Sequence, residues 1–212
     1  MTQITRAVNE PILSFAAGSP ERASLQAKYD EMATQTIEIP LIIDGKEIKT
    51  GDTGNCLMPH NHQHVLATYH KAGETEVIQA IDAAMKSWKT WSKTSLEERT
   101  KIFRKAAELL QGPWRDIINA ATMLNQSKNA FQAEVDAACE LIDFFNFNAQ
   151  YAEEITANQP LISPEGMHNH LEYRPLEGFV FAITPFNFTS IAGNLPSAPA
   201  LMGNVALWKP AS

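Results

Sequence analysis

The stretch Phe179-Val-Phe-Ala-Ile-Thr-Pro-Phe-Asn-Phe-Thr189 decides the fold class of this sequence. Its first five residues form a continuous apolar run, which is typical of a strand buried on both faces of a parallel sheet. An Ala-rich segment with helical spacing follows from Ser190 to Met202, although it contains two prolines, and Val205 to Trp208 is a second strand-like run. A strand, a helix and a second strand predict a βαβ unit, and therefore an α/β fold.

Three candidate site residues lie where these two strands end. In open α/β sheets, ligands bind outside the carboxyl ends of the strands, and Thr184 and Asn187 follow the first strand while Lys209 ends the second. The amide of Asn187 offers two N–H donors and has no proton to lose, which suits the stabilisation of an oxyanion. Two alternatives stay open: Asn187 caps the next helix or completes the turn, and Lys209 is simply solvated.

Upstream of this unit, the spacing of apolar residues predicts a long helix from about Asn129 to Ala152, sandwiched because it is apolar on two faces. Glu140 interrupts the second of its stripes, which otherwise consists of alanine and aromatic residues. A carboxylate in such a stripe is either a structural group with a partner or a residue of a pocket.

Three more helices are predicted before it. The first starts at Glu74 and places an apolar stripe, ending at Trp88, against a core. The second begins with a capping box formed by Thr94 and Glu97 and stops at Gly112-Pro113, and the third runs from Trp114 to Leu124.

The front of the chain is expected to contain a helix after Ser19-Pro20 and then a hairpin. Leu41–Ile43 and Glu47–Lys49 are strand-like, and Asp44-Gly45 between them suits a tight turn. A strand is also predicted from Leu171 to Leu176.

The alternating histidines His60, His62 and His64 are the one pattern that favours a metal. Pro59 breaks a strand there, and these histidines have no Cys or Asp partner near them. We therefore expect a solvated loop in place of a zinc site.

Composition excludes several classes of protein. The 212 residues carry a formal net charge of −7 and no basic run, which argues against nucleic acid or an anionic membrane as a partner. The sequence has no apolar stretch long enough to span a membrane and no recognisable targeting segment, so a soluble protein is expected. Cys56 and Cys139 are too few for a disulfide framework, which favours a reducing compartment.

Several motifs together resemble the aldehyde dehydrogenase superfamily. They are the turn from Thr184 to Thr189, the segment Asn194-Leu-Pro-Ser-Ala-Pro-Ala-Leu-Met-Gly-Asn204, and Leu207-Trp-Lys-Pro210. Phe186 in the turn, Glu10-Pro-Ile-Leu-Ser-Phe15, Gly18-Ser-Pro-Glu-Arg22 and the segment 133–145 are most similar to members that oxidise glutamate γ-semialdehyde to glutamate in proline breakdown. The similarity extends from about Asn9 to Ser212.

The resemblance implies roles for five residues. Asn187 matches the asparagine that stabilises the oxyanion, Lys209 matches the lysine at the adenosine ribose of NAD, and the backbone of Thr184 approaches the nicotinamide. Glu140 lies on the helix that lines the entrance for the aldehyde, and Phe188 lies next to Asn187 in the same pocket. In the family reaction a thiolate attacks the aldehyde, hydride passes to NAD, a glutamate activates water, and no metal takes part.

The resemblance also implies an architecture, namely the N-terminal part of the aldehyde dehydrogenase fold. We expect an arm with a short helix (1–38), a hairpin and strand region (39–70), the helical part of the NAD-binding domain (71–160), a strand of an oligomerisation flap (161–178) and the opening βαβ of a Rossmann-like core (179–212).

The catalytic Cys and Glu of the family lie beyond the position that matches Ser212, so the isolated chain is predicted to be inactive. A non-catalytic fragment or interaction module, or an enzyme for another aldehyde, are the alternatives. The resemblance implies a homo-oligomer, in the cytoplasm of a bacterium or in the mitochondrial matrix of a eukaryote.

Overall fold

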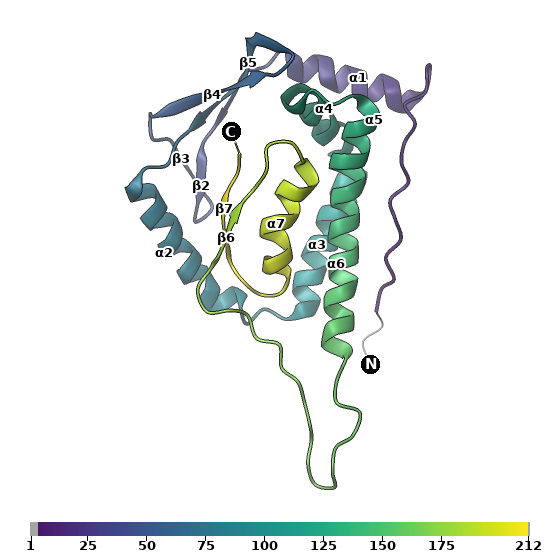
Figure 1. Cartoon of the computed structure of the whole chain (residues 1–212), viewed down its shortest axis with the longest axis vertical. Helices are drawn as coiled ribbons and strands as arrows, with labels where there is room; N and C mark the ends of the chain where they lie inside the picture. The colour runs from purple at the N-terminus through teal and green to yellow at the C-terminus, as the bar shows by residue number, and fades with distance from the viewer. Residues whose placement is uncertain (1–3, 212) are drawn as a thin grey trace.

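The computed structural model describes residues 4–211, and it is built from two small sheets, a hairpin and a layer of helices (Figure 1). Residues 1–3 of the expected arm and Ser212 of the expected βαβ segment lie outside the described residues. The helices are α1 (Pro20–Ala33), α2 (Glu74–Trp91), α3 (Leu96–Gln111), α4 (Arg115–Gln126), α5 (Ala130–Ala133), the π-helical segment η1 (Glu134–Cys139), α6 (Glu140–Ala157) and α7 (Thr189–Leu201). The strands are β1 (Ile37–Ile39), β2 (Leu41–Ile43), β3 (Lys46–Ile48), β4 (Thr53–Met58), β5 (Asn61–His70), β6 (Val180–Ile183) and β7 (Ala206–Lys209).

The predicted βαβ unit is formed by β6, α7 and β7. The two strands are parallel, with Val180 opposite Ala206 and Ile183 opposite Lys209. The connecting helix forms despite its two internal prolines. The α/β class and both strands of the unit are therefore confirmed.

The β6–β7 sheet is well covered on one face and largely open on the other, which differs from the predicted burial on both. Ala182 is 2% exposed, whereas Phe181 and Ile183 are 54% and 60% exposed. Helix α7 packs against both strands and α2 contacts β7, but within residues 4–211 these contacts leave more than half of Phe181 and Ile183 open. A continuous apolar run thus predicted the strand correctly and its surroundings incorrectly.

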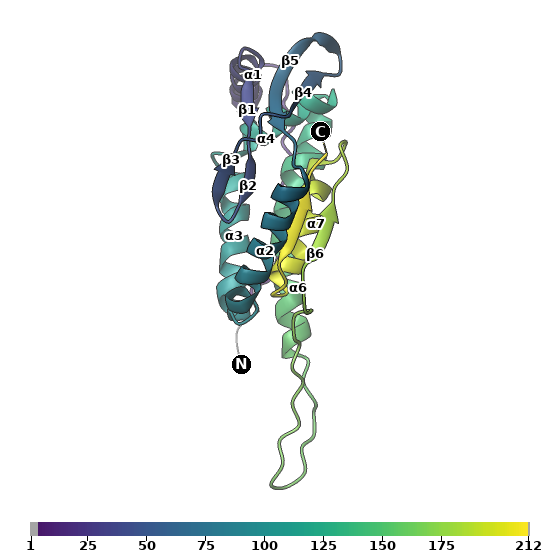
Figure 2. The same cartoon turned by 90° about the vertical axis from the view of Figure 1, so that its left-hand side faces the viewer.

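Helix α6 is sandwiched, as expected, because it packs against α3 on one side and α7 on the other (Figures 1 and 2). Gly193 of α7 permits the close approach: a Cβ at this position would lie 2.8 Å from Cδ1 of Leu141. The predicted single helix is instead three segments, since η1 separates α5 from α6. At the two ends of its stripes, Phe131 and Tyr151 are exposed.

Two predictions about the preceding helices need correction. The capping box of α3 is formed by Ser95 and Glu98, one residue after the predicted pair, and each backbone N–H donates to the other's side chain at 3.2 Å. Helix α2 does not bury its whole stripe, because Val77 and Ile78 are 43% and 51% exposed. Near its end, the Trp88 indole N–H donates to the Leu176 carbonyl at 2.9 Å. No helix in the described part of the chain is long and apolar enough to cross a membrane.

The front of the chain follows the predictions more closely. Ser19 caps α1 by accepting a hydrogen bond from the Arg22 N–H. Strands β2 and β3 form the expected hairpin, and Asp44 and Gly45 both have positive φ, at 52° and 72°. A tight turn requires this conformation, which Gly adopts at no cost and Asp tolerates.

The region of the alternating histidines is a strand, not the expected loop. His62 and His64 lie in β5, which pairs with β4 and with β1 in a three-stranded sheet. Pro59 falls in the short turn between β4 and β5, so it ends one strand without preventing the next. Among residues 4–211, no three His, Cys, Asp or Glu side chains gather in a way that would hold a metal ion.

The predicted strand from Leu171 to Leu176 is not formed. Residues 158–178, here called the projecting arm, form a long loop that extends away from the end of α6 and then returns to the body (Figure 1), where the Leu176 carbonyl accepts from Trp88 of α2. A strand needs a neighbouring strand for its hydrogen bonds. Here the side-chain amide of Gln159 takes that place, because it accepts from the Leu171 N–H at 2.8 Å and donates to the Leu171 carbonyl at 3.2 Å.

The N-terminal segment, residues 4–18, lies along α6 and closes over a buried charged cluster. The carboxylate of Glu134 accepts hydrogen bonds from Arg115, from Asn119 at 2.8 Å and from the Leu13 N–H at 2.9 Å. Arg115 also pairs with Glu10 of the segment. The cluster therefore joins the segment, α4 and η1.

Candidate functional site

The structure places Thr184 and Lys209 side by side at the carboxyl edge of the β6–β7 sheet. The Thr184 N–H donates to the Lys209 carbonyl at 3.3 Å, and the Trp208 indole donates to the Thr184 hydroxyl at 3.0 Å. Thr184 is buried, at 5% exposure, whereas Lys209 is exposed. The edge thus offers a fixed backbone from β6 and a solvent-accessible ammonium from β7.

Asn187 lies in the turn that leads from β6 into α7, and it is exposed. The capping residue of α7 is Phe188, with no side-chain hydrogen bond to the helix, so the alternative that Asn187 caps this helix is wrong. Within residues 4–211, the hydrogen bonds of Asn187 are made by its backbone carbonyl, and its side-chain amide has no partner. The amide is therefore available to a ligand.

The turn is held from outside, through contacts made by Asn187 and Phe188. The ammonium of Lys128 donates to the Asn187 carbonyl at 2.5 Å and lies 4.2 Å from the centre of the Phe188 ring. Such a position over an aromatic face is attractive because the ring face is electron-rich. The same ammonium pairs with Asp136 of η1 at 2.8 Å.

The first two residues of α7, which directly follow the turn, are held as well. The hydroxyl of Thr189 accepts from the Gln126 side chain at 2.8 Å and lies 2.8 Å from the Thr122 hydroxyl. Ser190 is completely buried and donates its hydroxyl hydrogen to the carboxylate of Glu140. Four consecutive residues, from 187 to 190, are thus fixed by side chains from α4, α6 and the loop before α5.

Sequence reasoning missed these supporting residues. Lys128 is 59 positions from Asn187, and Thr122 is 67 positions from Thr189. Nothing in the local spacing of the segment 122–128 points to a turn so far along the chain. The pairing of Ser190 with Glu140 could have been suspected, because a carboxylate in an apolar stripe requires a donor.

Glu140 has the structural partner that one of its two interpretations requires, namely Ser190. It is the first residue of α6, directly after η1, and π-helical turns occur frequently at functional sites. Its place in a substrate pocket stays a prediction, as does that of Phe188.

Neither cysteine touches the turn. Cys139 is buried in the charged cluster, where its sulfur lies 3.4 Å from Arg115 and 3.7 Å from the Pro11 carbonyl. Burial, with the nearby carboxylate of Glu134, raises its pKa to about 12. Cys56 lies half-buried in β4, and burial raises its pKa as well. Both thiols are therefore poor nucleophiles.

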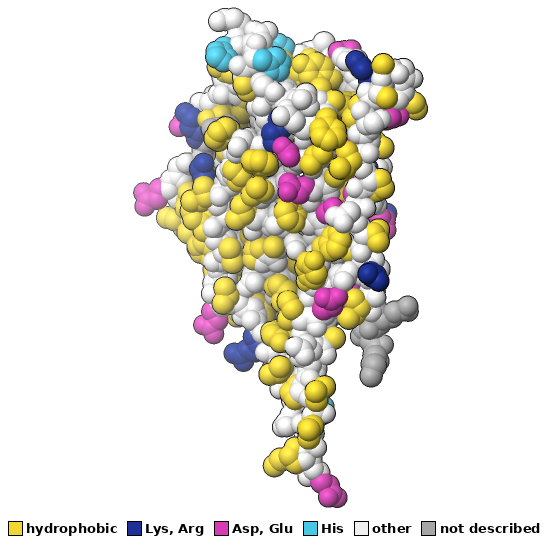
Figure 3. Space-filling view, turned by 45° about the vertical axis from the view of Figure 1, so that its right-hand side comes forward, with side chains coloured by type: hydrophobic (Ala, Val, Ile, Leu, Met, Phe, Trp, Pro, Cys, Tyr) yellow, Lys and Arg dark blue, Asp and Glu magenta, His cyan; other side chains and the backbone are white. Residues whose placement is uncertain are grey.

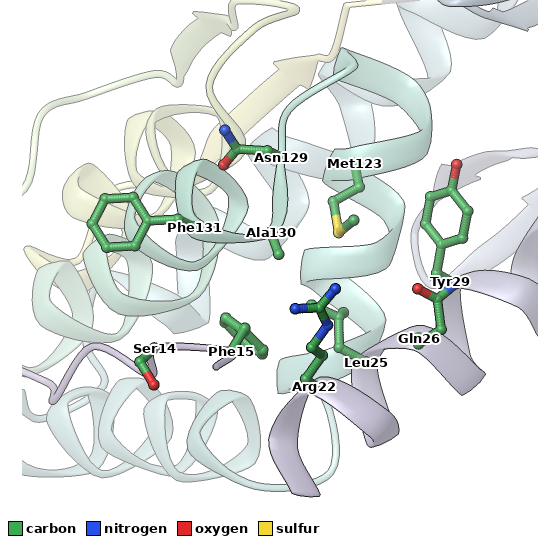
Figure 4. A pocket seen from close by; sticks show the side chains of 10 residues that line it. All are labelled: Ser14, Phe15, Arg22, Leu25, Gln26, Tyr29, Met123, Asn129, Ala130 and Phe131. Atoms are coloured by element: carbon green, nitrogen blue, oxygen red, sulfur yellow. The ribbon is translucent and has the colours of Figure 1, made fainter. Parts of the chain in front are cut away.

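A groove of about 420 Å³ lies away from this edge (Figure 4). Its lining comes from the N-terminal segment, α1, α4 and the start of α5, and it includes none of the five predicted site residues. Phe15 and Leu25, which line it, belong to the hydrophobic core where α1 meets α4. The groove thus lies along the packing interface between α1 and α4, and the carboxyl edge of the β6–β7 sheet remains the candidate site.

The chemistry of the edge is that of binding and charge stabilisation. It presents an unoccupied amide donor, an exposed ammonium and the backbone of a rigid turn. These groups suit hydroxyl or phosphate oxygens and a negative charge that develops on a substrate oxygen.

Comparison with known proteins gives a consistent result. The profile described as "Aldehyde dehydrogenase family" matches residues 48–212. Delta-1-pyrroline-5-carboxylate dehydrogenase of Agaricus bisporus is 50% identical over 204 residues, which are 96% of this chain and 37% of that protein. The mitochondrial enzyme of that name from Rattus norvegicus is 49% identical over 97% of this chain and 36% of its own length.

Solved structures agree with the sequence relatives. The crystal structure of the Delta-pyrroline-5-carboxylate dehydrogenase from Mycobacterium tuberculosis bound with NAD matches with a TM-score of 0.96 and 48% identity, over 100% of this chain and 39% of that chain. The expected fold, the N-terminal part of the aldehyde dehydrogenase fold, is confirmed. The chain spans about 37% of the length of the curated relative from Agaricus bisporus. On the strength of the profile match and the fold, the chain belongs to the aldehyde dehydrogenase family.

Proposed function

We propose that this chain supplies the oxyanion-stabilising amide and part of the cofactor site of an NAD-dependent dehydrogenase that oxidises glutamate γ-semialdehyde to glutamate in proline degradation. The observation that carries the proposal is the free amide of Asn187, exposed on a turn that is fixed, together with the start of α7, at residues 187–190. The printed names of the relatives with about 50% identity support the choice of substrate.

The residues at the edge fit NAD, which the Mycobacterium tuberculosis structure contains. The ammonium of Lys209 is exposed at the end of β7 and can donate to ribose hydroxyls. The backbone at Thr184 is held by Lys209 and Trp208, so it presents a fixed wall to the nicotinamide end. When bound, NAD accepts the hydride from the substrate carbon.

Asn187 acts on the substrate oxygen. As a thiolate adds to the aldehyde carbon, the carbonyl oxygen becomes negative, and the Asn187 N–H donates to that charge. Removal of one such donor costs about 2.7–4 kcal/mol of transition-state stabilisation in a well-studied protease. Neither Cys56 nor Cys139 is proposed to supply the thiolate. We assign the nucleophilic thiolate and the glutamate that acts as general base to parts of the enzyme outside this chain.

Glu140 and Phe188 are proposed to form one wall of the aldehyde pocket. Both lie beside the turn that carries Asn187: Glu140 through its bond with Ser190, and Phe188 as the next residue. Together they would place a carboxylate and an aromatic ring next to the reacting centre.

We also propose that the chain is divided into the five segments given above and that the full enzyme is a homo-oligomer. The projecting arm exposes Leu161, Ile162 and Met167 at 100%, 79% and 69%, and apolar side chains continue onto it from the body (Figure 3). A second copy that pairs with this arm would cover them and supply the strand partner that Leu171–Leu176 lacks. The compartment would be the bacterial cytoplasm or, in a eukaryote, the mitochondrial matrix, as the name of the rat relative indicates for that protein.

The test is a substrate comparison with an enzyme that carries this chain. The chain is joined to the remaining portion of the Agaricus bisporus relative, and NADH formation is measured with glutamate γ-semialdehyde and with aldehydes that lack its amino group. We expect kcat/KM to be on the order of 100-fold higher for glutamate γ-semialdehyde, because binding groups left unpaired by the other aldehydes penalise them. Faster oxidation of another aldehyde would exclude this substrate. As a control, the 212-residue chain alone should form no NADH.

A further inference from the structure

Lys128 donates a hydrogen bond to the Asn187 peptide from a distant part of the sequence, the loop of residues 127–129, which belongs to neither β6 nor α7. An ammonium has three N–H donors. One bonds the Asn187 carbonyl at 2.5 Å. The nitrogen also forms an ion pair with the Asp136 carboxylate at 2.8 Å and lies 4.2 Å from the ring centre of Phe188. The Lys128 side chain is only 15% exposed, so this arrangement is sheltered from water.

The bond to Asn187 controls more than one residue. The carbonyl that accepts it belongs to the peptide plane between Asn187 and Phe188, and a peptide unit moves as a rigid plane. Fixing that oxygen therefore restricts the direction in which the Asn187 side chain leaves the backbone, as well as the place of the Phe188 ring. The Phe188 carbonyl in turn accepts the Ala192 N–H at 3.0 Å, the first hydrogen bond of α7.

The other end of this connection is anchored in the interior. Asp136 belongs to η1, and the first residue of η1 is Glu134, which is completely buried and bonded to Arg115. The connection thus runs from a buried ion pair, through a π-helical segment and the Lys128 ammonium, to the turn that carries the free amide.

We infer that Lys128 is a positioning residue for the oxyanion site: its ammonium, held by Asp136, sets the orientation of the Asn187 amide. The inference rests on the proposed function, since it assigns Lys128 a role in the reaction that Asn187 serves. A displacement of about 1 Å in a reacting group can cost up to 100-fold in rate. Loss of Lys128 should therefore lower kcat while the binding of NAD at Lys209 is unaffected.

The first measurement does not depend on the reaction. Hydrogen exchange of the Ala192 amide is compared in the 212-residue chain and in its Lys128→Met and Lys105→Met variants. Lys105 is the matched control because it pairs with Glu108 at an exposed surface site. Lys128→Met should speed the exchange of Ala192 by about 10-fold, and Lys105→Met should leave it unchanged. Equal exchange in all three proteins would overturn the inference.

The second measurement separates positioning from general stability. In the completed enzyme, Lys128→Met should lower kcat about 10-fold or more in the wild-type background and have no further effect in the Asn187→Ala background, with an unchanged KM for NAD. Lys128→Arg, which keeps the positive charge, should lose less, and Asp136→Asn replaces Lys128→Met if that variant does not fold. An equal loss in both backgrounds would mean that Lys128 does not act through Asn187. If the completed enzyme does not oxidise glutamate γ-semialdehyde, the proposed function fails, and the exchange of Ala192 still decides the role of Lys128.

Discussion

At the level of single residues, Glu134 is a carboxylate buried in the interior that depends on hydrogen bonds and a counter-charge from its neighbours. It has no exposed surface, and burial alone would raise its pKa. Hydrogen bonds from Arg115, from the Leu13 N–H and from Asn119 outweigh burial and hold the pKa below the ordinary 4.5. For Arg115, burial lowers the pKa, but the bonds to Glu134 and Glu10 raise it further than burial lowers it. The pair is therefore charged in the folded protein.

We expect Glu134→Gln to destabilise the fold by about 3 kcal/mol, because it leaves the buried Arg115 charge without its main partner. Urea unfolding at neutral pH measures the loss. The matched control is Glu97→Gln, which breaks an exposed pair with Lys101 and should cost less than about 0.5 kcal/mol. Equal losses in the two variants would contradict the structural role of the cluster.

The same group predicts a pH dependence. Because the folded-state pKa of Glu134 is depressed, its contribution to stability is complete above pH 4.5 and is lost as the pH falls through the lower folded-state value. The free energy of unfolding of the wild type should therefore fall more steeply below pH 4.5 than that of Glu134→Gln. Parallel curves for the two proteins would show that Glu134 does not contribute.

Cys139 should resist alkylation in the folded protein. With a pKa of about 12, only about one thiol in ten thousand is a thiolate at pH 8, and the sulfur is also buried. Iodoacetamide labelling followed by mass spectrometry should modify Cys56 first and Cys139 only after unfolding. Labelling of both at one rate would contradict the buried position of Cys139.

The candidate site could be predicted from the sequence only in part. Thr184, Asn187 and Lys209 follow short apolar strands, and the carboxyl ends of parallel strands meet at one edge, so their proximity follows from the local pattern. Lys128 and Thr122 could not be identified in this way. They contact residues 187–189 from the loop after α4 and from α4 itself, 59 and 67 positions earlier in the chain, and no local spacing encodes that contact.

At the level of elements, the contact between α6 and α7 determines how closely the helical layer approaches the sheet. Gly193 faces Leu141, and a Cβ there would lie 2.8 Å from Cδ1 and 3.0 Å from Cδ2 of that side chain. Leu141 is buried, at 6% exposure, so it has little room to move.

Gly193→Val should therefore destabilise the protein by about 1–3 kcal/mol, as overpacking of a core does, although Val is a slightly better helix former than Gly. Thermal unfolding of the single variants and of Gly193→Val with Leu141→Ala completes a double-mutant cycle. We expect the double variant to lose less than the sum of the two singles. Strictly additive losses would mean that the two positions do not touch.

Some secondary-structure elements could be predicted from the sequence pattern, and others could not. The hairpin at Asp44-Gly45 and the cap of α1 at Ser19 could be predicted because their chemistry is local. The alternating histidines lie in a strand and not in the expected loop, because Pro59 falls in the turn before residues 61–70 and leaves the hydrogen bonds of that strand intact. The π-helical segment was missed because its Glu134 turns toward Arg115, a partner 19 residues away.

For the molecule as a whole, the surfaces left open lie around the candidate site and on the arm. Phe181, Ile183 and Trp208 expose about half of their side chains on the β6–β7 sheet, and the projecting arm is exposed along most of its length. The predicted burial of β6 on both faces and the predicted strand at Leu171–Leu176 both assumed neighbours that residues 4–211 do not provide. A sequence pattern reports that a segment is suited to such a neighbour, but it does not locate the neighbour.

The proposed role of Asn187 in stabilising the oxyanion is tested most directly by the kcat of Asn187→Ala in the completed enzyme. We expect kcat for glutamate γ-semialdehyde to fall by about 100-fold or more, because one oxyanion donor is lost. The melting temperature should not change, since the amide is exposed and makes no hydrogen bond within residues 4–211. An unchanged kcat in a folded Asn187→Ala enzyme would contradict this role.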